Sequence, residues 1–347
     1  MAKVMVAMSG GVDSSVAAAL LLEKGYEICG GTLILHDSEN VSSEVQKAKS
    51  VCDALGIEHF VFDERALFNE KVIKHFAVSY DSGFTPNPCI ECNKHLKFGK
   101  LLEHALSLGC DYIATGHYSR IEKCGERYAV VRPEDRKKDQ TYVLWQLSQH
   151  QLSHMLMPLG EYTKDEVRAI AQKYGFVSAG AKESQDICFV PDNDYVAFLE
   201  EYNGKSFVKG DYVDISGKKL GQHNGHQCYT IGQRKGLGIA LGKPQFVISK
   251  DVVTNRVVLS DEKHLFKTKV YINDINLMGI DSLETPVKCT AKLRYSAKDD
   301  ECAISKLNEY EALIEFKNPQ RAPSPGQSAV FYNGNVVLGG GIIIKGE

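Results

Sequence analysis

The sequence predicts an α/β fold, in which a parallel sheet with helices on both faces is followed by two small β domains. Strand-like and helical segments alternate in the first half of the chain, which is typical of a parallel sheet. After about residue 204, short β-like runs are separated by Gly, Asn, Asp and Pro, as in small all-β domains. A glycine-rich segment directly after the first strand predicts an anion-binding site at the end of the sheet.

Hydrophobic patterning places the elements of the first half. The expected strands are 3–8, 26–35, 59–63 and 112–115, and the expected helices are 12–24, 42–55, 65–79, 97–108 and 163–174. The last helix begins with a capping box formed by Thr163 and Glu166. Later expected strands are 246–249, 256–259, 270–275, 287–293, 311–316, 329–332 and 336–339. The predicted domains are a catalytic domain over 1–204, helical at about 140–200, a central small β domain over 205–268 and a C-terminal β-barrel-like domain over 269–347.

Composition favours a globular protein of the cytoplasm. Hydrophobic residues make up 43% of the 347 residues and charged residues 24%, close to the average of soluble domains. We see no apolar run long enough to span a bilayer and no secretory signal at the N-terminus. The net charge is −3, but residues 205–250 carry eight Lys or Arg against two acids. This basic stretch is either a solvated face or a contact for nucleic acid.

Ten cysteines are present, and in a cytoplasmic protein of this size they do not indicate a disulfide framework. Cys29, Cys52 and Cys110 lie in apolar patterns and are expected to be small core residues. Only Cys89 and Cys92 have a spacing typical of metal or redox sites.

The first motif is Ser9-Gly10-Gly11-Val12-Asp13-Ser14-Ser15, between the first strand and the first helix. Glycines allow a tight turn in which successive N–H groups face one concavity, and the helix N-terminus adds positive potential. The segment has no Lys, so it is not a Walker A loop. The alternative, a glycine-rich turn without function, is disfavoured by the position of the segment near the N-terminus, directly between a strand and a helix.

Two further segments contain candidate reactive thiols. In 85–94, Thr-Pro-Asn-Pro-Cys-Ile-Glu-Cys-Asn-Lys, two prolines stiffen a loop that presents Cys92 at a helix start. That position, with Lys94 and Lys97 nearby, predicts a lowered thiol pKa. The segment 183–190, Glu-Ser-Gln-Asp-Ile-Cys-Phe-Val, contains Cys188, which by itself would more often be a core residue.

The first motif resembles the signature of the PP-loop ATP pyrophosphatases, and the three segments together resemble the tRNA-specific 2-thiouridylases, the MnmA family. The resemblance covers the whole chain. Other family-like segments are 116–118 (Gly-His-Tyr), 138–142 (Lys-Asp-Gln-Thr-Tyr), 229–238, 293–295 and 322–327. The resemblance implies a Rossmann-like PP-loop catalytic domain and a tRNA-uridine 2-sulfurtransferase that thiolates carbon 2 of the wobble uridine in tRNAs for Lys, Glu and Gln.

The resemblance also implies how ATP is used. The uridine O2 attacks the α-phosphorus and pyrophosphate leaves, then a sulfur nucleophile displaces AMP. Asp13 would orient the phosphates and Mg²⁺. The implied ATP-binding residues are Ala7, Met8, Ser9, Gly10, Gly11, Val12, Asp13, Ser14, Leu33 and Gly116.

Two accounts of the sulfur step stay open. In the usual family account Cys188 carries a persulfide and Cys92 assists, releasing sulfide or closing a Cys92–Cys188 disulfide. This chain has Cys89 where many members have Asp. Three thiolates with one open position suit a 4Fe–4S cluster with Cys89, Cys92 and Cys188 as ligands.

The resemblance further implies contacts with tRNA. Asn87, Pro88 and Cys89 would line the target base, which must leave the anticodon stack. The other implied contacts are His117, Lys138, Asp139, Gln140, Arg294, Tyr295 and Gln327. A sulfur donor is needed, such as a cysteine desulfurase, a relay protein or free sulfide. A monomer without membrane contact is the default expectation.

Two alternatives remain. A PP-loop ligase acting on a small-molecule carboxylate or ureido group would need none of the three thiols. An RNA-binding protein with a relic nucleotide fold would not need the intact loop at residues 9–15. Pyrophosphate release from ATP separates the three: it should depend on tRNA, on a small acid, or not occur.

Overall fold

The computed structural model describes residues 1–37, 41–176 and 187–347. Its first sheet has the strand order β3-β2-β1-β4-β7, and every neighbouring pair is parallel. The strands are β1 (Lys3–Ala7), β2 (Glu27–Ile34), β3 (His59–Asp63), β4 (Tyr112–Ala114) and β7 (Met155–Leu156). The predicted α/β fold class is confirmed, and four of these strands match the expected ones closely.

Both faces of this sheet are covered by helices. Successive side chains of a strand point to opposite faces, so neighbouring residues of β1 pack in different clusters. Val4 and Val6 of β1 pack in one apolar cluster with α1 (Val12–Glu23) and α8 (Lys164–Lys173), whereas Met5 packs in another with α6 (Leu101–Ser107). Helix α2 (Val41–Leu55) contributes Ala48, Val51 and Cys52 to the first cluster. The expected core cysteines Cys29, Cys52 and Cys110 are all buried.

Two long helical segments carry the loop of the second motif between them. The first runs through α3 (Arg65–Phe68), η1 (Asn69–Ile73) and α4 (Lys74–Asp81). The second runs through α5 (Pro88–Cys92), η2 (Asn93–Lys100) and α6. It begins at residue 88, whereas we expected residue 97. The prolines favour a helix start here, because Pro88 at the first helical position lacks an N–H that would have no partner.

The remaining strands form two further sheets. A four-stranded sheet has the order β10-β11-β8-β9, with β8 (Gly210–Val213), β9 (Lys219–His223), β10 (Phe246–Asp251) and β11 (Arg256–Ser260). The third sheet contains a closed six-stranded barrel, because β12 pairs with both β15 and β17. Its strands are β12 (Phe266–Leu277), β13 (Val287–Lys292), β14 (Asp300–Lys306), β15 (Ala312–Arg321), β16 (Ser328–Asn333) and β17 (Val336–Gly346).

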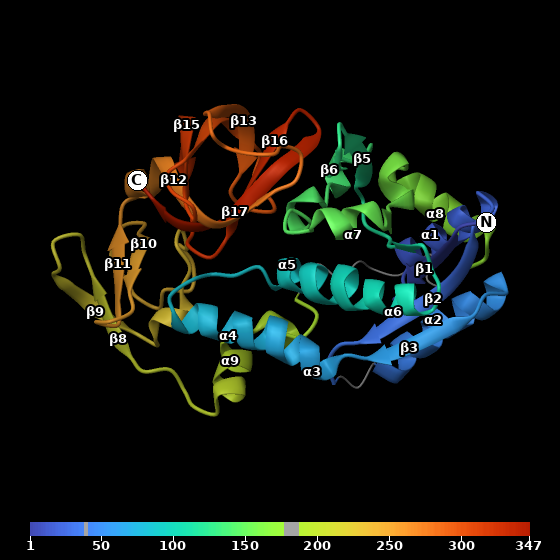
Figure 1. The fold of residues 1–347 in the computed structure, drawn as a ribbon. Helices are drawn as coiled ribbons and strands as arrows, with labels where there is room; N and C mark the ends of the chain where they lie inside the picture. The colour runs from blue at the N-terminus through green and yellow to red at the C-terminus, as the bar shows by residue number, and fades with distance from the viewer. Residues whose placement is uncertain (38–40, 177–186) are drawn as a thin grey trace.

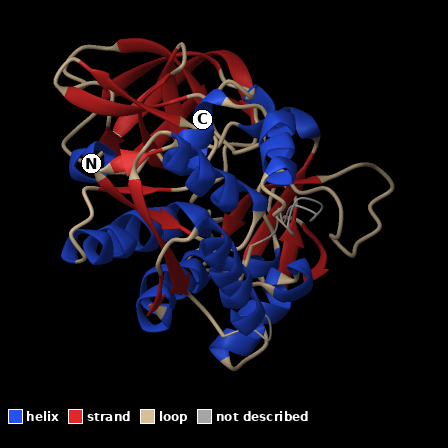
Figure 2. Cartoon of the chain, turned by 90° about the vertical axis from the view of Figure 1, so that its right-hand side faces the viewer, coloured by secondary structure: helices blue, strands red, loops and turns tan. Residues whose placement is uncertain are grey.

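A hairpin from the first half of the chain extends the barrel sheet. It consists of β5 (Arg120–Cys124) and β6 (Arg127–Val131), and Val131 pairs with Val336 of β17. Figure 1 shows this hairpin beside the barrel, with α5 and α6 below. Figure 2 shows the strands of the barrel gathered above most of the helices. Neither β5, β6 nor β14 was expected from the sequence.

The part expected to be helical at about 140–200 is less helical than predicted. Besides α8 it contains the short helix α7 (Gln149–Ser153), strand β7, several single turns and α9 (Tyr195–Asn203). The capping box of α8 is confirmed, since the Thr163 hydroxyl accepts from the Glu166 N–H and the Glu166 carboxylate accepts from the Thr163 N–H. No helix in the described part of the chain is both long and apolar enough to cross a bilayer.

Candidate active site

The glycine-rich segment joins the end of β1 to the start of α1. Gly11 occupies the position before the helix, and no side chain of the described residues caps the first turn. The hydroxyls of Ser9 and Ser14 lie 3.2 Å apart, and the Ser9 N–H donates to the Ser14 Oγ at 3.3 Å. The helix therefore presents its first N–H groups and two hydroxyls together, which is the arrangement that binds phosphate.

Two glycines in the site allow close approach of backbones. Gly10 has φ +72°, and a Cβ there would lie 2.7 Å from the Cβ of Lys47 on α2. A Cβ on Gly116, two residues after β4, would lie 2.7 Å from the Asp13 carbonyl carbon. The end of β4 thus lies directly against the nest, so the structure brings Gly116 to the residues of the first motif. Leu33, another of the implied ATP-binding residues, is half-buried near the end of β2.

Asp13 is held by two side chains that sequence reasoning missed. Lys164 is buried, and its Nζ donates to the Asp13 Oδ1 at 2.7 Å and Oδ2 at 3.0 Å. The Tyr118 hydroxyl donates to the Asp13 Oδ1 at 3.0 Å. Tyr118 lies in a family-like segment, which was its only signal, and Lys164 gave none because 151 residues separate it from Asp13.

The two cysteines of the second motif differ in environment. The Asn87 side chain accepts from the Cys89 N–H at 3.1 Å, so Cys89 lies in the first turn of α5 and is exposed. Cys92 lies one turn further on and is buried. Burial raises the pKa of the Cys92 thiol to about 12, and the nearby Lys97 ammonium opposes this only partly. The expected lowered pKa at a helix start was wrong, because desolvation outweighs the attraction of the lysine.

The third thiol lies between Ile187 and Phe189, which pack in the same apolar cluster as Cys92. Cys188 is an exposed residue, yet the protein around its sulfur raises the thiol pKa, the Cys89 sulfur raises it further, and Lys97 lowers it. Within residues 1–37, 41–176 and 187–347, no three His, Cys, Asp or Glu side chains form a group that could hold a metal ion. Residues 183–186 of the third motif lie outside the described residues.

His117 connects the thiols with the end of β4. Its ring lies 5.5 Å from that of Phe98 on η2, and its Nδ1 is 2.8 Å from the Thr115 hydroxyl. Burial lowers the pKa of His117 to about 3, and the Lys97 ammonium lowers it further. The imidazole is therefore neutral at pH 7 and serves as a hydrogen-bonding group.

Several expected tRNA contacts are engaged within the protein. The Asp139 carboxylate accepts from the Thr141 N–H at 2.9 Å, and the Gln140 Oε1 accepts from the Tyr118 N–H at 2.7 Å. The Arg294 Nη2 donates to three oxygens, the Ile231 carbonyl, the Ala322 carbonyl and the Ser324 hydroxyl. These side chains position the surrounding chain.

The other expected tRNA contacts vary in accessibility. Lys138 is partly exposed, and Tyr295 is an exposed aromatic that is 45% accessible, which suits stacking on a base. Near the thiols, Asn87 is partly exposed and Pro88 is buried. The Gln327 Nε2 donates to the Thr85 carbonyl at 2.8 Å, just before α5.

The basic stretch is mostly on the surface. Seven of its eight cations are exposed: Lys205, Lys209, Lys218, Lys219, Arg234, Lys235 and Lys243. The eighth, Lys250, is half-buried and donates to the Tyr229 carbonyl at 2.8 Å, and burial lowers its pKa to about 8. Lys250 is therefore not part of the exposed basic surface.

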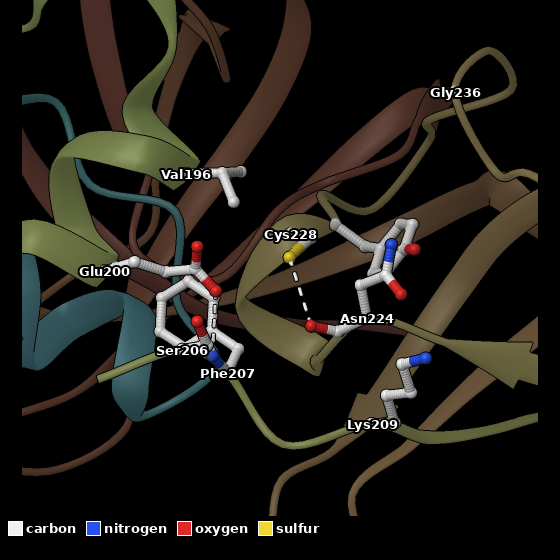
Figure 3. Close-up of a pocket in the computed structure, with 9 residues that line it drawn as sticks. Val196, Glu200, Ser206, Phe207, Lys209, Asn224, Cys228 and Gly236 are labelled. Carbon is white, nitrogen blue, oxygen red and sulfur yellow. Dashed lines mark hydrogen bonds between the residues drawn. The ribbon is translucent and has the colours of Figure 1, made fainter.

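A cavity of about 450 Å³ lies away from the nest, between α9 and the four-stranded sheet (Figure 3). It is lined by Val196, Glu200, Ser206, Phe207, Lys209, Asn224, Cys228, Tyr229 and Gly236. The Glu200 carboxylate accepts from the Phe207 N–H, and the Cys228 thiol donates to the Asn224 carbonyl. These polar groups already have partners, and none of the expected site residues lines the cavity.

Three family descriptions match the chain in sequence order. Residues 2–192 match the family described as tRNA methyl transferase HUP domain, residues 196–261 the tRNA methyl transferase PRC-barrel domain, and residues 267–343 the aminomethyltransferase beta-barrel domain. Among solved structures, a predicted subunit of tRNA methyltransferase from Methanocaldococcus jannaschii has a TM-score of 0.34 and 19% identity, over 59% of this chain and 89% of that one. That likeness is too low to carry an argument.

Curated relatives match over nearly the whole length. The tRNA-specific 2-thiouridylase MnmA of Carboxydothermus hydrogenoformans is 48% identical over 99% of this chain and 98% of that protein. The protein of the same name from Acetivibrio thermocellus is 48% identical over 98% of this chain and 99% of that protein. Identity at this level over the full length leads to one conclusion: the chain belongs to the family of tRNA-specific 2-thiouridylases.

Proposed function

We propose that the chain catalyses the ATP-dependent 2-thiolation of the wobble uridine of tRNA. The observation that carries this function is the placement of two adjacent residues at the end of β4. Gly116 lies against the backbone of Asp13 in the phosphate nest, and His117 lies against Phe98 on the helix of the thiols. An ATP α-phosphate in the nest and a sulfur on that helix can therefore act on one base between them.

The reaction has two displacements. The uridine O2 attacks the α-phosphorus of ATP, the bond between the α-phosphorus and the bridging oxygen breaks, and pyrophosphate leaves. A sulfur nucleophile then attacks carbon 2, the carbon–oxygen bond breaks, and AMP leaves with the former O2. The uncapped N–H groups of α1 and the hydroxyls of Ser9 and Ser14 hold the phosphates. Neutral His117 offers a hydrogen bond near the base.

Mg²⁺ usually enters such sites with the ATP phosphates and one or two carboxylates. Asp13 is the carboxylate of the nest, but both of its oxygens accept from Lys164 and one also accepts from Tyr118. The residues as placed do not fit a Mg²⁺ held directly by Asp13.

For the sulfur step we propose that Cys92 and Cys188 carry the chemistry, with Cys89 beside them. The proposal is supported by their mutual electrostatic influence and by the shared neighbour Lys97. Three thiols are the donors that a 4Fe–4S cluster prefers, but no described trio is placed as a metal site. The thiols as placed do not fit a cluster, and the proposed route uses a persulfide on Cys188 and a thiol on Cys92.

The persulfide step balances without a bound cofactor. The terminal sulfur of the Cys188 persulfide attacks carbon 2 while AMP leaves. The Cys92 thiolate then attacks the Cys188 sulfur, which breaks the bond to the transferred sulfur and closes a Cys92–Cys188 disulfide. A thiol reductant reopens it to two thiols, and a cysteine desulfurase or a relay protein that carries a persulfide then transfers its outer sulfur to Cys188. Free sulfide instead enters by attacking the Cys188 sulfur of the disulfide, which leaves a Cys188 persulfide and a Cys92 thiol. The proposed setting is the cytoplasm, with the enzyme as a monomer.

The tRNA would lie across the exposed basic surface of residues 205–243, Lys138 and Tyr295. Seven exposed cations on one stretch suit a polyanion, and Tyr295 offers a face for stacking. Asn87, Pro88 and Cys89 at the start of α5 would face the flipped base. Arg294 and Gln327 would act mainly by holding the loops that contact the RNA.

The test is pyrophosphate release from ATP by the full chain, with tRNA, with small carboxylates or ureido compounds, or with no acceptor. We expect release only with tRNA, together with 2-thiouridine in the product when a sulfur source is present. Release with a small acid alone would support the ligase, and no release would support the RNA-binding protein. Ser14→Ala removes one hydroxyl of the nest and should slow release, whereas Ser50→Ala on the exposed side of α2 is the matched control.

A further inference from the structure

A buried lysine ammonium faces the phosphate nest from another part of the chain. Lys164 is the first residue of α8 and is 7% exposed, and both Asp13 oxygens accept from its Nζ. Burying an ammonium costs free energy unless a counter-charge lies beside it. Thr163, not Lys164, caps α8, and a cation is unfavourable at a helix N-terminus, so this arrangement points to a specific use of the charge at Asp13.

Tyr118 fixes the same carboxylate from the other side. Its hydroxyl donates to the Asp13 Oδ1 at 3.0 Å, and the Lys164 Nζ lies 5.6 Å from the centroid of its ring. Tyr118 is 3% exposed. Charge-assisted hydrogen bonds of this kind are among the stronger ones in proteins, so the orientation of Asp13 depends on where Lys164 and Tyr118 lie.

Both residues are anchored at their main chain to one segment, 135–140. The Lys164 N–H donates to the Asp135 Oδ2 at 3.1 Å. The Tyr118 N–H donates to the Gln140 Oε1 at 2.7 Å, and the Gln140 N–H donates to the Tyr118 carbonyl at 3.1 Å. The segment therefore contacts Lys164 at one end and Tyr118 at the other.

The same segment presents cations outward. Arg136 and Lys137 are exposed and Lys138 is partly exposed, and they form a single turn, η3 (Arg136–Lys138). The Asp135 Oδ1 accepts from the Lys137 N–H at 3.0 Å. A phosphate backbone that binds these cations thus pulls on a turn whose two ends hold the two partners of Asp13.

We propose that Lys164 and Tyr118 are positioning residues that couple tRNA binding at 135–140 to the setting of Asp13 in the ATP site. The inference rests on the proposed function, because it takes the segment as a tRNA contact and the nest as the ATP site. Coupling between two binding sites is reciprocal. Bound nucleotide must therefore tighten tRNA binding by the same factor by which tRNA tightens nucleotide binding.

The chain contains a matched control for this pair. At the other end of α8, the Lys173 Nζ donates to the Glu23 Oε1 at 3.2 Å and the Tyr174 hydroxyl donates to the same oxygen at 2.7 Å. Glu23 thus has the same two kinds of partner as Asp13, but it lies at the far end of α1 from the nest. Lys173→Met and Tyr174→Phe remove the same groups without touching Asp13.

The experiment measures the Kd of tRNA with and without α,β-methylene-ATP, an analogue that resists cleavage at the reacting bond. For the parent protein, Lys173→Met and Tyr174→Phe we expect the analogue to tighten tRNA binding by about 5- to 150-fold, the usual range for coupled sites. For Lys164→Met and Tyr118→Phe we expect a ratio close to unity. Tyr118→Phe removes a single hydroxyl, so it keeps the test valid if Lys164→Met does not fold.

A merely structural role would lower stability but leave the ratio unchanged. A parent-like ratio in folded Tyr118→Phe or Lys164→Met overturns the coupling, and so does a parent ratio of about one. Loss of the ratio in the Lys173 or Tyr174 variants would also overturn it, because the effect would then not depend on Asp13. Binding of tRNA by the parent protein is measured before any variant. A parent protein that binds no tRNA would refute the proposed function itself.

Discussion

The Gln327 side chain donates a hydrogen bond to the Thr85 carbonyl at 2.8 Å, joining a turn of the barrel to the loop that leads into the helix of the thiols. The Thr85 N–H donates in return to the Pro325 carbonyl at 2.8 Å. Gly326, between these two barrel residues, has φ +88°. The position of Cys89 and Cys92 thus depends on the C-terminal barrel, although about 240 residues separate the two segments.

Gly326→Ala should displace that loop. A Cβ there would lie 2.7 Å from the Phe84 Cβ and 2.8 Å from the Thr85 nitrogen. We expect about 1–3 kcal/mol of lost unfolding free energy from the clash, beyond the strain of a left-handed alanine, and a slower sulfur-transfer step. Gly334→Ala is the control, because Gly334 also has positive φ but its Cβ would meet no atom within 4 Å. Equal stability of the two variants in chemical denaturation would contradict the clash.

Asp13→Ala should abolish pyrophosphate release and also weaken the fold. From the sequence alone an intact fold is expected, because residues of a phosphate-binding loop do not fill a core. The structure shows instead that Asp13 is the carboxylate beside buried Lys164. We expect a loss of at most about 3 kcal/mol, the low end for a broken buried ion pair, since the Asp13 side chain is 33% exposed.

A double variant separates the two effects. Asp13→Ala with Lys164→Met should regain much of the stability while pyrophosphate release stays lost, because the buried charge is gone but the nest is incomplete. Glu23→Ala, which removes the exposed carboxylate beside Lys173, should leave both readouts near those of the parent. A double variant less stable than either single one would show that the pair is not the cause.

Local sequence patterns correctly predicted the elements that depend on interactions between residues close in the sequence. Strands β1 to β4 and the capping box of Thr163 follow from alternation and spacing within a few residues. The contact of Lys164 with Asp13 joins the first turns of two helices, α8 and α1, that are far apart in the sequence, and no periodicity records it. The pKa of Cys92 was misjudged for the same reason, since Cys92 is buried in a cluster that includes Phe189 and Leu199, far along the chain.

Cys92 in the free protein should react as a buried thiol. With a pKa of about 12, the thiolate fraction rises about tenfold per pH unit between pH 7 and 10. Alkylation by iodoacetamide, followed by mass spectrometry of the peptide, should show this rise without a plateau. Exposed Cys89 should be modified first.

Lys97→Met should slow that alkylation at every pH, because the Lys97 ammonium lowers the Cys92 pKa. Lys94→Met is the control: it removes a neighbouring cation that acts on Glu91. A plateau of Cys92 alkylation below pH 9 would mean that the thiol is far more acidic than its burial implies.

Cys89→Asp decides how sulfur is handled, because it places a carboxylate where many family members have one. With a persulfide on Cys188 and a thiol on Cys92, Cys89 does no chemistry, and the substitution should leave thiolation nearly unchanged. If the three thiols close around a 4Fe–4S cluster, replacing one thiolate by a harder oxygen ligand should make the cluster labile and lower thiolation, most sharply in air. Cys92→Ala and Cys188→Ala should be inactive in both accounts.

The measurement is iron content, visible absorbance and thiolation rate of Cys89→Asp beside the parent, both prepared without oxygen. The control is Cys124→Ser, which changes a half-exposed cysteine of the β5–β6 hairpin. Cys228→Asp is less suitable, because the Cys228 thiol donates to the Asn224 carbonyl beside a cavity. The proposed persulfide step predicts an iron-free parent and a nearly silent substitution. Stoichiometric iron in the parent that falls in Cys89→Asp, with thiolation falling in step, would instead require the thiols to draw together around the cluster and would replace the persulfide step.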